Sequence, residues 1–225
     1  MRDVLRSTSA HVFVDDITSP VLSVDDAHHL SRVLRLRDGE KVSVCDGAGS
    51  WLVAEWRGAE LLPVGEAVLD PAPADVTVAF VPVKGDRCDA AVEKMVEIGV
   101  TGIVVLAPTE HSVVRWDDAK AAANVARYSR IARAASAQSR RTHLPSVTGP
   151  VPLSEMVGRD GVAMAEPGGD PSLDGVTTLL VGPEGGFSPA EVSSARRTVG
   201  LGTGILRADT AAVVAATLLV AHPRR

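Results

Sequence analysis

Hydrophobic and polar positions alternate in short runs over the first seventy residues of the chain. Such runs, bounded by turn signals such as Asp46-Gly47, are typical of strands. One helix is expected among them, because Ser23 and Asp26 have the spacing of a capping box ahead of an apolar face. The strands predicted in this part of the chain are His11–Val14, Glu40–Asp46, Ser50–Trp56 and Leu61–Leu69.

After Asp75 short apolar runs alternate with helical patterns, which is typical of an α/β domain with a mainly parallel sheet. The segment 70–74, rich in Pro and Ala, indicates a linker, so we expect two domains, 1–72 and 75–225. Pro167–Pro171 is the one flexible-looking insert in the second domain. Its predicted strands are Val76–Val83, Ile103–Leu106, Val162–Ala165 and Thr177–Val181, and its predicted helices are Ala90–Ile98 and Asp117–Gln138.

The composition excludes several classes of protein for this chain. A hydrophobic content of 45% in 225 residues can bury a sizeable core, and an aromatic share of 3% argues against a base-stacking platform for single strands. Cys45 and Cys88 form no ligand motif, so neither a disulfide framework nor a metal site is indicated. With no apolar run of about 18 residues and no signal-peptide core, we expect a cytoplasmic protein without membrane association.

The charge is unevenly distributed. A formal net charge of −5 argues against a nucleic-acid partner, because phosphate contacts supply most of the affinity for nucleic acids. Between His111 and Pro145, however, basic residues outnumber acidic ones, which fits either an RNA-facing surface or an ordinary solvated helix face. The basic residues are Arg115, Lys120, Arg127, Arg130, Arg133, Arg140 and Arg141, against Asp117 and Asp118.

The segment Thr177–Glu191 combines an apolar strand, a glycine-rich loop and a helix start. Ser188 is an N-cap candidate and Glu191 completes a capping box. A loop at the carboxyl end of a buried strand is where α/β sheets bind ligands, and its glycines let the backbone approach one closely. A tight structural turn is the alternative. The motifs of dinucleotide-binding folds and P-loops are absent, so neither of those ligand classes is supported.

The segment Val199–Thr210 repeats the order of strand, glycine loop and helix. Asp209 or Thr210 is expected to cap the helix that follows. This helix, Ala211–Val220, is apolar on nearly every side and must therefore be buried. Its burial could lie in the centre of the domain or at a subunit interface.

These segments resemble a known family. VGPEGGFSPAE (181–191) and LGTGILRADTA (201–211) are similar to the two C-terminal signatures of the bacterial 16S rRNA uracil-N3 methyltransferases of the SPOUT class. The segments 84–100, 138–145 and 28–47 also resemble that family, in the same order. The resemblance therefore spans nearly the whole chain.

The resemblance implies a PUA-like β-barrel followed by an α/β SPOUT domain with a C-terminal trefoil knot. It also implies a homodimer, S-adenosylmethionine as cofactor, and 16S rRNA of the small ribosomal subunit as substrate, methylated at N3 of a uridine. Three loops would hold the cofactor. Their implied cofactor residues are Ala165, Glu166, Gly182, Pro183, Glu184, Gly186, Leu201, Gly202, Ile205, Leu206 and Arg207.

The chemistry of N3 methylation suggests roles for a few side chains. Removal of the imide proton places negative charge on O2 and O4 of uracil, which a cation would stabilise, and Arg207 is the candidate. Glu184, or else Asp209, could act as general base. The candidate RNA contacts are His11, Arg32, Arg35, Lys84, Arg87, Arg140 and Arg141, with Arg32 and Arg35 expected on one helix face.

The chain departs from the family pattern at four positions, namely His11, Ala137, Gly204 and Asp209. Backbone and apolar contacts dominate the expected cofactor site, so these changes bear on RNA contacts and on the catalytic acid or base. Two other functions stay open from the sequence. One is a SPOUT enzyme that methylates another RNA position, such as a ribose 2′-hydroxyl, and the other is a non-catalytic RNA-binding or ribosome-assembly protein.

Overall fold

The computed structural model describes residues 2–58 and 60–223 and divides them into two compact units. Unit 1 comprises the chain up to Pro73 together with Ser136–Leu144, and unit 2 comprises Ala74–Ala135 and the chain from Pro145 onward. The contiguous domains expected from the sequence differ from these units in one respect. The segment Ser136–Leu144 leaves the second domain and packs with the first.

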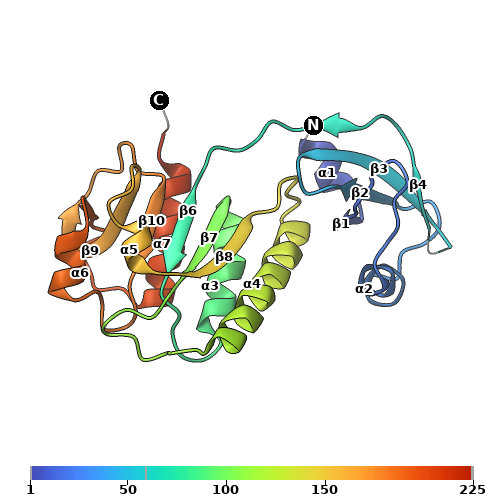
Figure 1. Cartoon of the computed structure of the whole chain (residues 1–225). Coiled ribbons are helices and arrows are strands. Elements are labelled where there is room, and N and C mark those ends of the chain that lie inside the picture. Colours follow the sequence, from blue (N-terminus) through green and yellow to red (C-terminus); the bar gives the residue numbers. More distant parts are fainter. Residues whose placement is uncertain (1, 59, 224–225) are drawn as a thin grey trace. The chain divides into compact units, whose positions relative to one another are not determined.

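Unit 1 is built on a five-stranded sheet (Figure 1) in which the strands follow one another in the order β1-β2-β3-β4 and β5 pairs with β3. β1 is parallel to β2, and the other pairs are antiparallel. Its elements are α1 (Arg2–Ser7), β1 (Ala10–Phe13), α2 (Val24–His28), a π-helix (His29–Val33), β2 (Lys41–Cys45), β3 (Ser50–Arg57), β4 (Glu60–Pro63) and β5 (Val68–Leu69).

Both faces of the unit 1 sheet are covered. Val42 and Val44 of β2 point into one cluster with Leu30, whereas Cys45 and Trp51 belong to a second cluster on which Leu144 packs. The backbone supports this second contact, because Gly49 N–H donates to Thr142 O and Leu144 N–H donates to Gly47 O, at 3.0 and 2.9 Å. Apolar packing and strand-like pairing thus explain why Ser136–Leu144 belongs to unit 1.

Two predictions in unit 1 were wrong in detail. The single strand expected over Leu61–Leu69 is two strands, interrupted at Gly65, whose φ of +101° does not fit a strand. Ser23 caps its helix as predicted, but the helix ends after one short α-helical segment and one π-helical turn. Arg35 lies beyond it with φ +53°, so Arg32 and Arg35 do not share a regular helix face.

Unit 2 is an α/β domain with a fully parallel six-stranded sheet in the order β11-β9-β10-β6-β7-β8 (Figure 1). This agrees with the mainly parallel sheet expected from the alternation of apolar runs and helices. Its elements are β6 (Thr77–Phe80), α3 (Arg87–Ile98), β7 (Gly102–Leu106), α4 (Asp118–Gln138), β8 (Ser146–Val151), α5 (Leu153–Met156), β9 (Val162–Asp170), β10 (Thr178–Val181), α6 (Pro189–Ser194), β11 (Thr198–Val199) and α7 (Ala208–Ala221).

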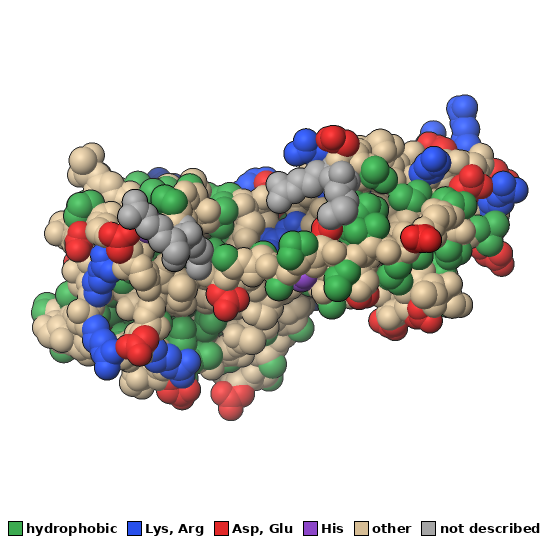
Figure 2. Space-filling view, turned by 90° about the horizontal axis from the view of Figure 1, so that it is seen from above, with side chains coloured by type: hydrophobic (Ala, Val, Ile, Leu, Met, Phe, Trp, Pro, Cys, Tyr) green, Lys and Arg blue, Asp and Glu red, His purple; other side chains and the backbone are tan. Residues whose placement is uncertain are grey.

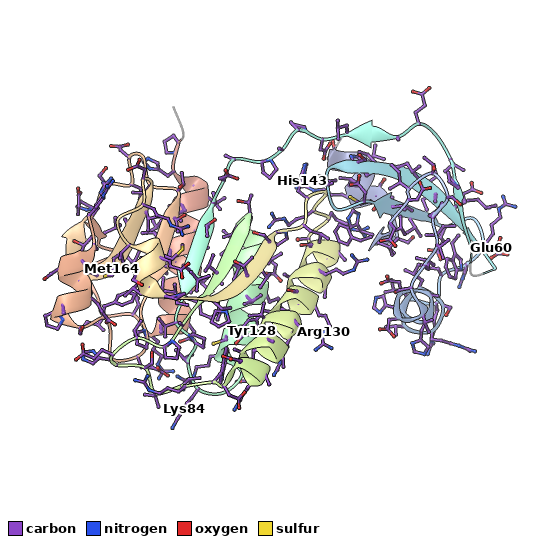
Figure 3. All side chains as sticks on the ribbon, viewed as in Figure 1. Glu60, Lys84, Tyr128, Arg130, His143 and Met164 are labelled. Atoms are coloured by element: carbon purple, nitrogen blue, oxygen red, sulfur yellow. The ribbon has the colours of Figure 1, made fainter. Side chains whose placement is uncertain are left out.

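The strands of unit 2 send alternate side chains to two apolar layers. On β6, Val78 and Phe80 pack with residues of α3, α4 and α7, whereas Ala79 packs with residues of α5 and α6. Tyr128 of α4 lies against Phe80, and Met164 of β9 lies in the opposite layer (Figure 3). Because both faces are covered, the central strands read as continuous apolar runs.

Three expectations for unit 2 are corrected by the structure. Pro167–Asp170 is no flexible insert, because β9 continues through it. Arg207, with extended ψ of 151°, is the N-cap of α7, and Asp209 and Thr210 lie inside the helix. α7 is buried on one side only, at residues such as Ala212 and Leu219, while 39% of Val220 is exposed. The elements α1, α5 and β8 were not predicted.

Among the described residues no helix is both long and apolar enough to cross a membrane.

The extension of β9 is in direct backbone contact with the segment after β11. A Cβ on Gly169 would lie 2.7 Å from the carbonyl carbon of Val199, and one on Gly200 would lie 2.8 Å from the carbonyl oxygen of Gly169. Neither backbone atom can move aside as a flexible side chain could. The two segments can therefore lie this close only because both positions are glycine.

We expect Gly169→Ala and Gly200→Ala each to lower the free energy of unfolding by about 1–3 kcal/mol, because overpacking forces the backbone apart. Urea denaturation followed by circular dichroism measures this change. Gly204→Ala is the matched control, since nothing lies within 4 Å of its Cβ position. Equal stability of all three variants would contradict the close approach.

Candidate active site

A hollow in unit 2 lies at the carboxyl end of β10, beside the middle of β9 and the start of α7. It encloses about 640 Å³ of space not filled by atoms, part of it open to solvent. Residues 165–167 of β9, the loop after β10, the segment after β11 and the first turn of α7 form its walls. The lining residues are Ala165, Glu166, Pro167, Val181, Gly182, Pro183, Glu184, Gly186, Phe187, Leu201, Gly202, Gly204, Ile205, Leu206, Ala208 and Ala211.

The hollow brings together the residues that the family resemblance implied for the cofactor. All of them line it except Arg207, which lies between the lining residues Leu206 and Ala208. Their role in binding stays a prediction. Sequence reasoning missed several lining residues that flank the predicted loops or belong to α7, and the one available signal was adjacency to a glycine loop. The missed residues are Pro167, Val181, Phe187, Ala208 and Ala211.

The central loop, residues 182–187, is shaped by glycine and by the helix that follows it. Gly186 adopts φ +70°, which a residue without a Cβ does at no steric cost. A Cβ on Gly182 would lie 3.1 Å from the ring of Phe187, so that position is closed to larger residues. Ser188 and Glu191 then form the predicted capping box of α6, which sets where the loop ends.

The charged side chains that line the hollow are carboxylates. Glu166 is half-buried and Glu184 is exposed. Arg207 is exposed at the N-terminus of α7, and Asp209 is half-buried in the first turn. Apolar walls, backbone groups from glycine loops and two carboxylates suit a small organic ligand that carries positive charge. Within the described residues no group of three or more His, Cys, Asp or Glu could hold a metal ion.

The predicted RNA contacts fall into two groups. Lys84 and Arg87 of unit 2, and Arg32 and Arg35 of unit 1, are all exposed. Lys84 projects outward from the loop between β6 and α3 (Figure 3). These four side chains are free to reach a phosphate.

Arg140 and Arg141 form the second group and are half-buried within unit 1. Nη1 and Nη2 of Arg140 donate to Oγ1 and to the carbonyl oxygen of Thr8, both at 2.8 Å. Burial lowers the pKa of both guanidinium groups. The guanidinium group of Arg140 therefore links the segment Ser136–Leu144 to the rest of unit 1.

His11 of β1 contacts the segment Ser136–Leu144 and is only 6% exposed. Its Nε2 donates to the carbonyl oxygen of Arg141 at 2.9 Å, so the neutral ring accepts from the hydroxyl of Ser43 at Nδ1, 2.7 Å away. Burial lowers its pKa from 6.5 to about 4. A buried, neutral ring does not offer a cation to phosphate, so the geometry argues against His11 as an RNA contact.

Comparison with known proteins places the chain in a family. A model described as an RNA methyltransferase domain matches residues 70–220, and one described as an RNA methyltransferase PUA domain matches residues 22–55. A protein of Synechocystis sp. (strain ATCC 27184 / PCC 6803 / Kazusa) named Ribosomal RNA small subunit methyltransferase E is 32% identical, over 86% of this chain and 70% of its own. The chain belongs to the small subunit methyltransferase E family. The resemblance seen in the sequence is thereby confirmed.

Other members of the small subunit methyltransferase E family match over similar spans. The protein of that name from Mycobacterium tuberculosis (strain CDC 1551 / Oshkosh) is 29% identical, over 95% of this chain and 87% of its own. Among solved structures, the Neisseria gonorrhoeae enzyme bound to S-adenosyl methionine has a TM-score of 0.77 at 26% identity. A probable rRNA-methyltransferase from Porphyromonas gingivalis has a TM-score of 0.76 at 30% identity. Each structural match covers 93% of this chain and 96% of the other.

The buried His11 predicts a pH-dependent stability. Because the folded pKa of about 4 lies below the unfolded value of 6.5, the unfolded state binds a proton first as the pH falls. From pH 7 to pH 5 the free energy of unfolding should drop by about 2 kcal/mol through this group, and its contribution should level off below pH 4. Urea titrations of wild type and His11→Gln at both pH values measure it. Equal pH dependence in the two proteins would contradict the assignment.

Proposed function

We propose that this protein transfers a methyl group from S-adenosylmethionine to N3 of a uridine in 16S rRNA of the small ribosomal subunit. The observation that carries the proposal is the convergence of three segments, the middle of β9 and the loops after β10 and β11, on one hollow at the carboxyl end of β10. Those segments contain the residues that the family resemblance implied. Membership of the small subunit methyltransferase E family supports the substrate, and the cofactor named in the Neisseria gonorrhoeae structure supports the ligand.

The residues of the hollow fit S-adenosylmethionine. Val181, Leu201 and Leu206 supply apolar walls, and the loops at Gly182 and Gly202 supply backbone donors and acceptors. Glu166 and Glu184 suit a cofactor that carries an ammonium and a sulfonium group. When bound, the cofactor supplies a methyl group on positively charged sulfur.

The side chains of this protein would act on the uracil ring. As the N3–H proton leaves and the N3–CH₃ bond forms, the sulfur–methyl bond breaks and S-adenosylhomocysteine is released. Arg207, exposed at the N-cap of α7 beside the hollow, would stabilise the negative charge on O2 or O4. Glu184, or else the half-buried Asp209, would accept the proton.

We assign RNA binding to both parts of the chain, with residues 1–72 as the RNA-binding domain and residues 75–225 as the methyltransferase domain. The exposed Arg32, Arg35, Lys84 and Arg87 are the proposed phosphate contacts. Arg140 and Arg141 would support the RNA-binding unit from inside. On the face shown in Figure 2, acidic and basic side chains are interspersed. On this face, single well-placed cations would therefore provide the affinity.

The resemblance extends to finer features of the fold. We propose that the sheet of unit 1 belongs to a PUA-like barrel and that unit 2 is a SPOUT domain with a C-terminal trefoil knot. The support for the knot is the family resemblance, and in the structure the segments at Gly169 and Gly200 lie side by side. Since the substrate is ribosomal RNA, we also assign the protein to the cytoplasm.

We further propose that the protein is a homodimer. Its support is the composition of α7, which is apolar on nearly every side but covered on only one within this chain. Val213 and Val214 are half-buried, and Val220 is 39% exposed. Pairing with the same surface of a second copy would remove these side chains from water.

The function is tested by incubating the protein with small ribosomal subunits and S-adenosylmethionine and analysing the RNA nucleosides by mass spectrometry. We expect N3-methyluridine. Gly182→Val should weaken cofactor binding by about tenfold or more in calorimetry, because its side chain would collide with Phe187. Glu93→Gln, exposed on α3, is the control. A ribose methylation would favour the other SPOUT activity, and a wild type that binds no cofactor would favour a non-catalytic role.

Arg207→Ala should separate catalysis from binding. Loss of a cation that acts only on the charge of the transition state should lower the single-turnover rate by about 10²–10³ and leave RNA affinity nearly unchanged. Arg87→Ala should instead weaken RNA binding and reduce its salt slope by about one unit. Rapid-quench kinetics and filter binding measure both. If Arg207→Ala weakens RNA binding as much as it slows the reaction, Arg207 is a phosphate contact.

A further inference from the structure

A turn outside the hollow makes side-chain contacts with the central glycine loop. This turn, residues 109–112, follows β7 and is closed by Ser112, whose N–H donates to Thr109 O and whose hydroxyl accepts from Thr109 N–H, at 3.2 and 2.8 Å. Nη2 of Arg115 donates to the carbonyl oxygens of Thr109 and Glu110, each at 3.4 Å. The turn is therefore a well-ordered local structure with partners of its own.

One carboxylate joins this turn to the end of the glycine loop. Oε2 of Glu191 accepts from Ser188 N–H at 2.8 Å as part of the capping box of α6. Its second oxygen, Oε1, accepts from Glu110 N–H at 2.9 Å. A capping box requires only the first of these bonds. The second ties together two segments that are 81 positions apart in the chain.

A second contact is made with Gly185, which does not line the hollow. Nδ1–H of His111 donates to the carbonyl oxygen of Gly185 at 3.1 Å, and a Cβ on Gly185 would lie 3.0 Å from Cβ of His111. Glu184 and Gly186, on either side of Gly185, line the hollow, whereas Gly185 does not. The loop thus has the hollow on one side and the turn on the other.

We propose that Glu191 and His111 are positioning residues that hold the glycine loop, residues 182–187, in the shape that binds the cofactor. Neither side chain lines the hollow. They act on the ligand through the loop, by linking it to a turn that Ser112 and Arg115 close. The inference rests on the proposed function, because S-adenosylmethionine is the ligand whose binding it concerns. Preorganisation of this kind raises affinity, since the loop does not have to be ordered on binding.

The chain offers a matched pair of variants for Glu191. Glu191→Ala removes both bonds, whereas Ser188→Ala weakens the same helix cap but keeps the bridge to Glu110 N–H. We expect Glu191→Ala to weaken S-adenosylmethionine binding by about tenfold in calorimetry, and Ser188→Ala to change it by less than about twofold. Equal losses in the two variants would show that Glu191 serves the cap alone, and the bridge would have no role in binding.

His111 allows a rescue experiment that does not depend on the stability of α6. An asparagine amide can place a donor near the position of Nδ1, so His111→Asn should keep the bond to Gly185 O, and His111→Ala cannot. Cofactor affinity should stay within about threefold of wild type in His111→Asn and fall by about tenfold in His111→Ala. If both variants bind as wild type does, His111 does not position the loop.

Hydrogen exchange gives a readout that a purely structural role would not change. In wild type, S-adenosylmethionine should slow exchange of the Glu110 amide more than that of Ser146, which donates to Thr101 O on the far side of the sheet. In Glu191→Ala the cofactor should slow exchange of the two amides equally. Equal protection of both amides in wild type would overturn the proposal. Absence of any cofactor binding by wild type would instead overturn the proposed function.

Discussion

The extension of β9 lies against the segment after β11, backbone to backbone, and the cofactor hollow depends on that contact. With any side chain at Gly169 or Gly200, a Cβ would lie less than 3 Å from a backbone atom of the other segment. The contact sets β11 beside β9 at the edge of the sheet, which brings residues 201–206 to the same end as the loop after β10. Three segments from distant parts of the sequence can then share one ligand.

The parallel sheet explains why those segments converge. All strands of unit 2 run in the same direction, so β9 beyond its pairing with β10 and the loops that follow β10 and β11 lie at one edge. Apolar side chains cover both faces, which leaves that edge as the place where backbone groups are available to a ligand. The first turn of α7 closes the site through Ala208 and Ala211, whose small side chains leave room beside the loops. The same strands and the same helix thus form both the apolar core and the walls of the hollow.

Much of this could be predicted from the sequence where a local rule decides the structure. Ser188 and Glu191 form the expected cap, because a capping box depends only on two residues that are three positions apart. Pro167–Asp170 was misjudged as an insert, because its Pro and Gly suggest a loop and only the partner segment at Val199 makes it a strand. The same holds for the bond between Glu191 and Glu110, which joins distant segments. The family resemblance identified most of the residues that line the hollow, whereas contacts between distant segments were not predictable.

The segment Ser136–Leu144 shows that side chains of a recognised motif can have partners that the sequence does not reveal. Its arginines suggest phosphate contacts, and in the structure Arg140 bonds to Thr8 and the carbonyl oxygen of Arg141 accepts from His11. His11 is one of the departures from the family pattern, and a buried imidazole can stay neutral where a guanidinium cannot. In this chain the ring joins β1 to the returning segment without placing another charge beside Arg140. The departure from the family pattern is therefore compatible with an intact unit 1, whose exposed cations lie elsewhere.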